Sequence, residues 1–314
     1  MTRCWRPGRP VPVLTIWATL RRGGGDPAFI LDREAVWRSL RTPEGAATLQ
    51  VETRAAGAEV HARSWGPGAV WTLDRLPQML GDDDVGAGDF RGDTFGNGLG
   101  CGDSFLRGAT RRHPHWRVPR TDLVFEALLA AVLEQKVTGQ EAWAGWRALL
   151  RRFGEPAPGP GAERGLWVTP TPATVAAIPS WEWLRLPVDP ARSRTAVLAA
   201  RLATSLERTV GLPATEVERR LCSLQGVGRW TAAEVRQRAH GDADAVSFGD
   251  YHVPADIGHT LTGRPVDDAG LAALLAPYRP HRYRVQRLVE LCGARTPRRG
   301  PRMAPRRHLP TRYR

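Results

Sequence analysis

The sequence predicts an α+β protein, in which a small antiparallel β-sheet near the N-terminus is followed by an all-helical domain. Residues 11–80 alternate apolar and polar side chains, as strands with one buried face do, and are divided by turn-forming segments. From Thr121 onward, apolar residues recur at the three- and four-residue spacing of helices. The chain of 314 residues is long enough for two domains, which we place at residues 1–110 and 111–293.

The N-terminal domain is expected to hold a few short strands and one or two short helices. The segments GGGDP, TPEG, AAG and GPG separate the strand-like runs, because glycine and proline favour turns. Residues 81–120 are rich in glycine, aspartate and arginine, and are predicted to be a linker between the domains. The expected strands are residues 11–20, 47–54, 58–65 and 69–74, and the clearest expected helix is residues 74–80.

The second domain is predicted from apolar periodicity and from helix start and stop signals. Thr138 is placed to cap one helix, and Asp189 to cap another that has Pro190 in its first turn. Residues 155–165 are expected to form a loop, and the basic, proline-rich residues 294–314 a disordered tail that adds non-specific DNA affinity at most. The expected helices are residues 121–135, 138–153, 172–178, 189–208, 215–223, 230–240, 254–261, 267–276 and 280–292.

Two glycines, Gly226 and Gly228, lie between two of these predicted helices and indicate a tight hairpin. Glycine leaves the backbone N–H groups uncovered, and the dipole of the second helix favours negative charge at its start. The hairpin is therefore predicted to hold a phosphate on the amides around Gly226, Val227 and Gly228. Arg229 and Thr231, which begin the second helix, are expected to add contacts to DNA.

A carboxylate, Asp250, follows Gly228 by 22 residues in an apolar, turn-rich segment that ends at Pro254. A phosphate-binding turn followed at this distance by a partly buried carboxylate suggests chemistry on the DNA backbone. The alternative is that Asp250 only caps the helix predicted to start at Pro254, whose positive end would attract a carboxylate.

The motif LQGVGRWTA, followed by GDYHVP, resembles the helix-hairpin-helix DNA glycosylases, in the branch of 3-methyladenine DNA glycosylase II. The resemblance spans residues 119–292 and includes the upstream segment FEALLAAVLEQKVTGQEAW. An LxGxG hairpin alone also occurs in ligases, polymerases and nucleases that only grip DNA, whereas a following aspartate makes the pattern more specific. The resemblance implies an N-terminal sheet domain, a helix-hairpin-helix domain, and cleavage of the bond between a damaged base and its sugar.

The resemblance also implies the reaction type. A carboxylate near C1′ stabilises an oxocarbenium-like transition state and orients or deprotonates the attacking water, and Asp250 is the candidate for this catalytic role. Glycosylases that also cut the strand carry a lysine in the hairpin, where this chain has Trp230. A monofunctional enzyme that removes alkylated purines and leaves an abasic site is therefore expected. The alternative is a non-catalytic helix-hairpin-helix module that binds damaged or distorted DNA.

A base inside a duplex must be flipped out to reach the carboxylate, so a base-binding pocket is expected. Trp230 is a candidate to stack on a cationic alkylated base, with Phe248 and Tyr251 as candidate pocket walls. Glu234 is a candidate to attract the positive charge of the base. The alternatives are that Trp230 belongs to the core and that Glu234 pairs with Arg238 one helical turn away.

Two further segments are assigned through the resemblance. Gln135 and Lys136 match the segment that lies at the DNA minor groove in this family, where relatives often place an apolar wedge in the gap left by the flipped base. Lys136 at that point departs from the pattern. Glu290 on the last helix is expected near the same pocket, with an ion pair to Arg287 as the alternative.

Composition points to a polyanionic partner. The net charge is +13 and the isoelectric point is near 10.9, which favours nucleic acid, although high-GC coding bias alone would also produce an arginine-rich chain. The resemblance implies that this partner is double-stranded DNA with damaged bases. No redox cofactor, iron–sulfur cluster or metal site is expected, apart from a monovalent cation at the hairpin, because the cysteines are scattered. We expect a cytoplasmic monomer that does not bind membranes. The four cysteines are Cys4, Cys101, Cys222 and Cys292.

Overall fold

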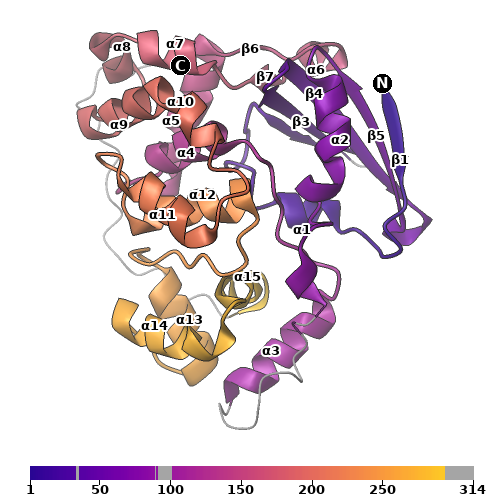
Figure 1. Ribbon diagram of the computed structural model, residues 1–314, viewed down its shortest axis with the longest axis vertical. Helices are drawn as coiled ribbons and strands as arrows, with labels where there is room; N and C mark the ends of the chain where they lie inside the picture. The colour runs from indigo at the N-terminus through magenta and orange to yellow at the C-terminus, as the bar shows by residue number, and fades with distance from the viewer. Residues whose placement is uncertain (33–34, 89, 91–100, 294–314) are drawn as a thin grey trace.

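The predicted α+β class is confirmed by the computed structural model, which describes residues 1–32, 35–88, 90 and 101–293 (Figure 1). The N-terminal strands form one side of the molecule and the later helices the other. The predicted tail at residues 294–314 lies outside the described residues.

A five-stranded antiparallel sheet forms the N-terminal part, with strand order β1-β5-β4-β3-β2. The residues of β5 alternate between buried and more exposed positions, which fits a sheet with one face on the core. Helix α2 lies across this sheet in Figure 1. The strands are β1 (Thr2–Trp5), β2 (Phe29–Leu31), β3 (Ala35–Thr42), β4 (Gly45–Arg54) and β5 (Glu59–Trp65).

Two segments expected as strands, residues 11–20 and 69–74, are helices instead. The first contains α1 (Val13–Trp17), and the second forms the start of α2 (Ala69–Met79), which also includes almost all of the expected helix at residues 74–80. The buried side chains of α2 recur every three or four residues, because a helix lies with one stripe on the sheet. These side chains are Ala69, Thr72, Leu73, Leu76 and Met79.

Strand β3 did not show an alternating pattern, because buried polar residues interrupt it. Arg38 and Ser39 are almost fully buried in its middle. The Arg38 guanidinium donates to Glu126 Oε1 at 2.6 Å, and the Ser39 hydroxyl donates to the carbonyl oxygen of Trp167 at 2.6 Å. These partners lie far away in the sequence, so the strand is not visible from local pattern alone.

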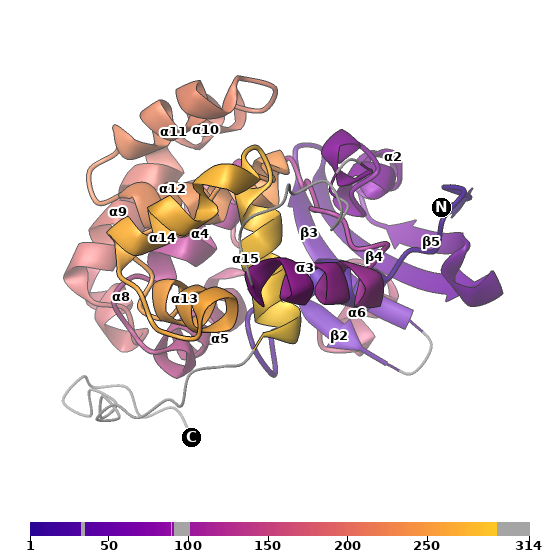
Figure 2. The ribbon, with the colours of Figure 1, turned by 90° about the horizontal axis from the view of Figure 1, so that it is seen from below.

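The segment expected as a linker, residues 81–120, contains a helix, α3 (Cys101–Arg112). Leu106 and Ala109 of α3 are fully buried in a second core cluster, together with residues of α13, α14 and α15. Figure 2 shows α3 and α15 side by side where the sheet and the helices meet. The predicted domain boundary after residue 110 stays a prediction, and it falls inside α3.

The helical part follows the predicted order closely. The expected loop at residues 155–165 contains β6 (Glu155–Pro156) and the short α6 (Pro160–Glu163), and β6 pairs with β7 (Trp167–Val168), which follows the loop. A π-helical turn, Arg236–His240, continues α12. The remaining helices are α4 (Val124–Leu133), α5 (Gly139–Phe153), α7 (Pro172–Ala177), α8 (Ser180–Arg185), α9 (Pro190–Arg201), α10 (Ala203–Glu207), α11 (Ala214–Cys222), α12 (Arg229–Val235), α13 (Val253–Thr262), α14 (Asp268–Leu275) and α15 (Arg282–Cys292).

Helix starts agree with the expected caps. The Thr138 hydroxyl accepts a hydrogen bond from the amide of Glu141, whose carboxylate accepts one from the amide of Thr138 in return. The Asp189 carboxylate accepts the amides of Ala191 and Arg192 at 2.9 and 3.1 Å. Such caps depend only on neighbouring residues, which is why they are predictable.

Helix α4 is the centre of the helical part. All but one of its ten residues are buried, and it packs against α9 and α12. Its residues share one large core with the sheet and with α1 and α2, so the two parts of the chain are joined by a continuous apolar interior. Within the described residues, no helix has both the length and the apolar character needed to cross a bilayer.

Candidate active site

The turn between α11 and α12 is the predicted hairpin, and its first glycine is required by the backbone. Gly226 has φ +88°, in the left-handed region that side chains disfavour. A Cβ atom at this position would lie 2.1 Å from the hydroxyl oxygen of Thr195 on α9, which is far inside contact distance. The hairpin therefore packs on α9 with no room for a side chain at Gly226.

The second glycine leaves the outer side of the turn open. A Cβ atom on Gly228 would meet no atom within 4 Å, and both Gly226 and Gly228 are exposed. Gly228 is the N-cap residue of α12, whose first amides have no partner within the helix. Exposed amides at a helix start can bind an anion such as a phosphate. Val227 between the glycines is buried and anchors the turn to the core.

The candidate catalytic carboxylate, Asp250, is held close to this hairpin. Asp250 Oδ2 accepts a hydrogen bond from the indole nitrogen of Trp230 at 3.1 Å. Asp250 Oδ1 accepts the backbone amides of His252 and Val253 at 2.7 and 3.0 Å, at the start of α13. The carboxylate is half-buried, and no ion pair to it is found in the described part of the chain. Three N–H donors thus fix an aspartate that forms no ion pair with the described residues.

Trp230 connects the hairpin to the carboxylate. It is the second residue of α12, two positions after Gly228, and it is half-buried. Its indole N–H is directed at Asp250, so the residue is not simply part of the core. The hydrogen bond places Asp250 within one side-chain length of the turn that is predicted to hold DNA.

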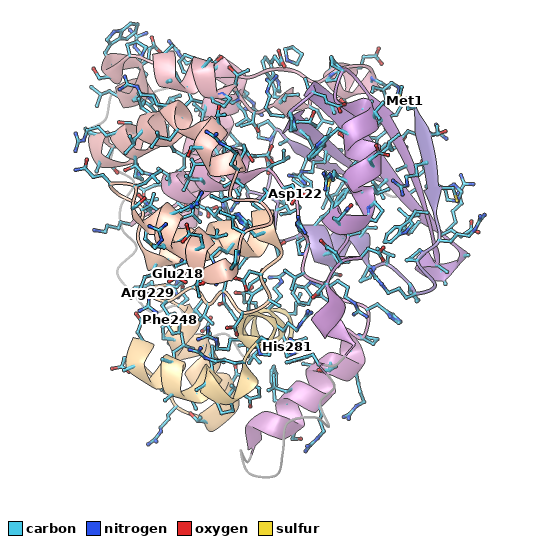
Figure 3. All side chains as sticks on the ribbon, viewed as in Figure 1. Met1, Asp122, Glu218, Arg229, Phe248 and His281 are labelled. Atoms are coloured by element: carbon cyan, nitrogen blue, oxygen red, sulfur yellow. The ribbon has the colours of Figure 1, made fainter. Side chains whose placement is uncertain are left out.

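Arg229, Phe248 and Tyr251 lie on the exposed side of this region. The Arg229 guanidinium lies 5.0 Å from the centre of the Phe248 ring, and Figure 3 shows the two residues close together near the start of α12. Tyr251, next to Asp250, is 84% exposed and packs edge-on against His252. An exposed cation and an exposed aromatic ring therefore lie in the segments that flank Trp230 and Asp250 in the sequence.

Glu234 does not face this surface, which corrects its assignment as a base-binding residue. It is 8% exposed and forms an ion pair with Arg238 at 2.7 Å, the alternative expected from their spacing. The hydroxyl of Ser247 also donates to Glu234 at 2.7 Å. Burial alone would lower the pKa of Arg238, but the charge of Glu234 raises it above its ordinary value.

Glu290 also forms the ion pair expected as the alternative to base binding. Its carboxylate pairs with Arg287 at 2.8 Å and accepts a hydrogen bond from Gln286 at 2.9 Å. Gln286 in turn donates to Ser247 at 3.1 Å, so α15 joins the network around Glu234. Glu234, Ser247 and Gln286 form a buried polar network, whereas Glu290 is exposed at the edge of this network. The assignment of Glu290 to the base-binding pocket stays a prediction.

Gln135 braces the hairpin instead of facing outward. Its amide nitrogen donates to the carbonyl oxygen of Gly226 and to the hydroxyl of Thr231, both at 2.8 Å. Thr231 itself is 2% exposed, and its expected contact with DNA stays a prediction. Lys136 beside it is exposed and has φ +53°, a strained value for a residue with a side chain.

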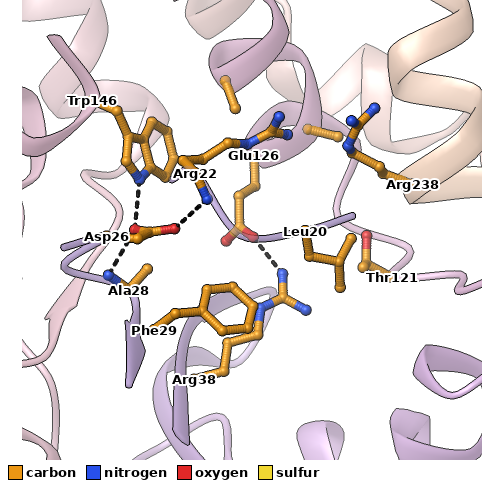
Figure 4. Close-up of a pocket in the computed structure, with 12 residues that line it drawn as sticks. Leu20, Arg22, Asp26, Ala28, Phe29, Arg38, Thr121, Glu126, Trp146 and Arg238 are labelled. Atoms are coloured by element: carbon orange, nitrogen blue, oxygen red, sulfur yellow. Dashed lines mark hydrogen bonds and ion pairs between the residues drawn. The ribbon is translucent and has the colours of Figure 1, made fainter. Parts of the chain in front are cut away.

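A cavity at the seam between the sheet and α4 is separate from this site. Figure 4 shows hydrogen bonds to Asp26 and the ion pair of Arg38 with Glu126 among the residues that line it. Asp26 accepts the indole N–H of Trp146 at 2.9 Å, and Glu126 accepts from Arg38. Asp250 is not among the residues that line it, so this cavity belongs to the interior of the fold.

The comparisons with known proteins identify the fold. No protein-family model matches the chain. The 3-methyladenine DNA-glycosylase of Archaeoglobus fulgidus superimposes with a TM-score of 0.74 and 15% identity, over 92% of this chain and 97% of that one. The 8-oxoguanine glycosylase/lyase of Clostridium acetobutylicum superimposes with a TM-score of 0.67 and 12% identity, over 93% and 96%. The chain has the fold of the helix-hairpin-helix DNA glycosylases.

Sequence similarity places this glycosylase fold near AlkA. Two Mycobacterium tuberculosis proteins, described as bifunctional transcriptional activator and DNA repair enzyme AlkA, are 30% identical over 189 residues. The matched region is 59% of this chain but 37% of the relatives, so the chain spans little more than a third of the length of the proteins it matches. The resemblance to the AlkA-like branch, expected from the hairpin and aspartate motifs, is confirmed.

Proposed function

We propose that this chain is a monofunctional DNA glycosylase of alkylation repair, which hydrolyses the N-glycosidic bond of alkylated purines of the 3-methyladenine type and leaves an abasic site. The similarity to AlkA and the glycosylase fold support the general reaction. The observation that carries the proposal is the hydrogen bond from Trp230 to Asp250, because it holds an ionisable oxygen pair beside the glycine hairpin.

Asp250 supplies the negative charge that the reaction needs. As the bond between C1′ and the base nitrogen breaks, its electron pair leaves with the base and positive charge develops on the sugar. A fixed carboxylate stabilises that charge more than flexible water does, because its donors already orient it. Water then bonds to C1′ and loses a proton, for which Asp250 is the acceptor in reach.

The hairpin positions the nucleotide. The exposed amides around Gly226 and Gly228 hold the phosphate next to the lesion, and Arg229 adds charge on the same side. Gln135 contributes indirectly, because its two hydrogen bonds fix the hairpin backbone. A monovalent cation at the hairpin carbonyls and the covering of the gap in the duplex by Lys136 remain parts of this proposal.

The absence of strand cleavage is proposed from the amine chemistry. Lys136 is the single lysine of the chain, and Trp230 stands where strand-cutting relatives carry a nucleophilic lysine. Arginine stays protonated near neutral pH and does not form a Schiff base. A flipped cationic base would instead stack on the indole of Trp230, with Phe248 and Tyr251 as pocket walls.

The proposal is tested with duplexes that contain 3-methyladenine or 7-methylguanine. Wild-type protein is expected to release the free base, and Asp250→Asn to bind the duplex without releasing it. Strand breaks should appear only after alkali treatment, since an abasic site is the product. Binding by both proteins without base release would instead identify a non-catalytic module, and breaks without alkali would refute the monofunctional reaction.

A further inference from the structure

A cluster of three potential metal ligands lies on the sheet, away from the candidate active site. Cys4 of the edge strand β1 is paired directly opposite His61 of β5. Glu59 lies two residues before His61, so it is on the same face of β5. Figure 1 shows β1 and β5 at the outer side of the sheet, far from α11 and α12.

The ligand atoms of the three side chains converge. Cys4 Sγ lies 3.9 Å from His61 Nε2, which lies 3.1 Å from Glu59 Oε2, and all three atoms are within 4.8 Å of one another. Ligand atoms around a tetrahedral zinc ion, with bonds of about 2.0–2.3 Å, lie roughly 3.3–3.8 Å apart. The cluster therefore needs only small side-chain movements to surround one ion.

The arrangement does not match a nucleophilic triad. In a triad, the carboxylate would bind the imidazole nitrogen opposite the one that faces the thiol. Here both Cys4 Sγ and Glu59 Oε2 lie near the same nitrogen of His61. Three donors that meet at one point are the geometry of a metal site.

We propose that Cys4, Glu59 and His61 bind a zinc ion that pins strand β1 to β5. A thiolate, an imidazole and a carboxylate are the ligands that zinc accepts, and they include no set suited to calcium or magnesium. Cys4 is exposed, so water completes the fourth position. The other oxygen of Glu59, Oε1, accepts from Arg6 Nε at 2.6 Å, which orients Oε2 toward the site.

The site departs from the expectation that the scattered cysteines bind no metal. The cluster cannot be recognised from cysteine spacing, because Cys4 and His61 are 57 residues apart and meet only through strand pairing. Its role is structural: β1 is an edge strand of four residues, and a bound ion would join its end to the body of the sheet.

The test uses the full chain stripped of metal and then titrated with zinc against a chromophoric chelator. Wild-type protein should bind one equivalent, and Cys4→Ser and His61→Ala should each lose at least about tenfold in affinity. Cys222→Ser is the matched control, because Cys222 is also an exposed cysteine but lies on α11. It should bind like wild type.

Cobalt and thermal unfolding give independent readings. Cobalt should produce a thiolate charge-transfer band in wild type and Cys222→Ser, and none in Cys4→Ser. Zinc should raise the melting temperatures of wild type and Cys222→Ser, because the ion binds the folded state, and leave that of Cys4→Ser unchanged. Equal zinc affinity in wild type and Cys4→Ser, or no stoichiometric binding by wild type, would overturn the proposal.

Discussion

Replacement of Gly226 by alanine should destabilise the protein strongly, because two costs coincide there. An alanine at φ +88° is strained by about 1–2 kcal/mol. Its Cβ would lie 2.1 Å from Thr195 Oγ1, and Thr195 is buried with its hydroxyl bonded to the carbonyl of Ala191, so overpacking adds about 1–3 kcal/mol. Alanine also lowers the conformational entropy of the unfolded chain, which stabilises the folded protein by about 0.4–1 kcal/mol. The expected net loss in the free energy of unfolding is about 1–5 kcal/mol.

Urea unfolding measures this loss, and two variants test its cause. Gly228→Ala has φ −101° and open space around the new Cβ, so its stability should stay within about 1 kcal/mol of wild type. Thr195→Ala removes the nearest atom, so Gly226→Ala combined with it should recover part of the loss. Equal losses for the two single glycine variants, or no recovery in the double variant, would refute the packing of the hairpin described above.

Three further predictions concern the site and its surroundings. Trp230→Phe keeps a ring but removes the N–H that Asp250 accepts, so the single-turnover rate should fall about tenfold with duplex affinity retained; an unchanged rate would dismiss the positioning role. Arg229→Gln should weaken duplex binding and reduce the salt slope by about one, measured by anisotropy at several salt concentrations, whereas an unchanged slope would remove Arg229 from the interface. Burial lowers the pKa of His240 to about 4 from 6.5, so the folded protein keeps this side chain neutral at a pH where the unfolded chain protonates it. The free energy of unfolding should therefore be highest above pH 6.5 and about 2 kcal/mol lower at pH 5. His240→Gln should lack this loss in urea unfolding, and a loss of the same size in the variant would assign it to other groups.

The elements that the sequence predicts well depend on neighbouring residues. The capping interactions of Thr138 and Asp189 and the glycine hairpin at Gly226 involve contacts a few residues apart, so their patterns are visible in the chain. Strand β3 was missed because Arg38 is buried through a partner 88 residues away. The two helices expected as strands bury apolar side chains in the core, and a short apolar run does not distinguish such a helix from a strand.

In the candidate site, too, local sequence patterns predict contacts between near residues and do not predict contacts between distant ones. The spacing of Glu234 and Arg238 predicts the ion pair that the structure contains. The brace from Gln135 to Gly226 joins residues 91 apart, and no local pattern reveals it. The bond between Trp230 and Asp250 likewise requires the segment after α12 to fold back on the start of that helix.

The most direct test of the central claim compares two aspartates that both cap a helix. Asp250 accepts amides at the start of α13, and Asp267 accepts the amide of Gly270 at the start of α14. If Asp250 is catalytic, the single-turnover release of 7-methylguanine should fall at least about 100-fold in Asp250→Asn and stay near the wild-type rate in Asp267→Asn. Similar rates in both variants, with matching losses of stability, would show that Asp250 is only a helix cap.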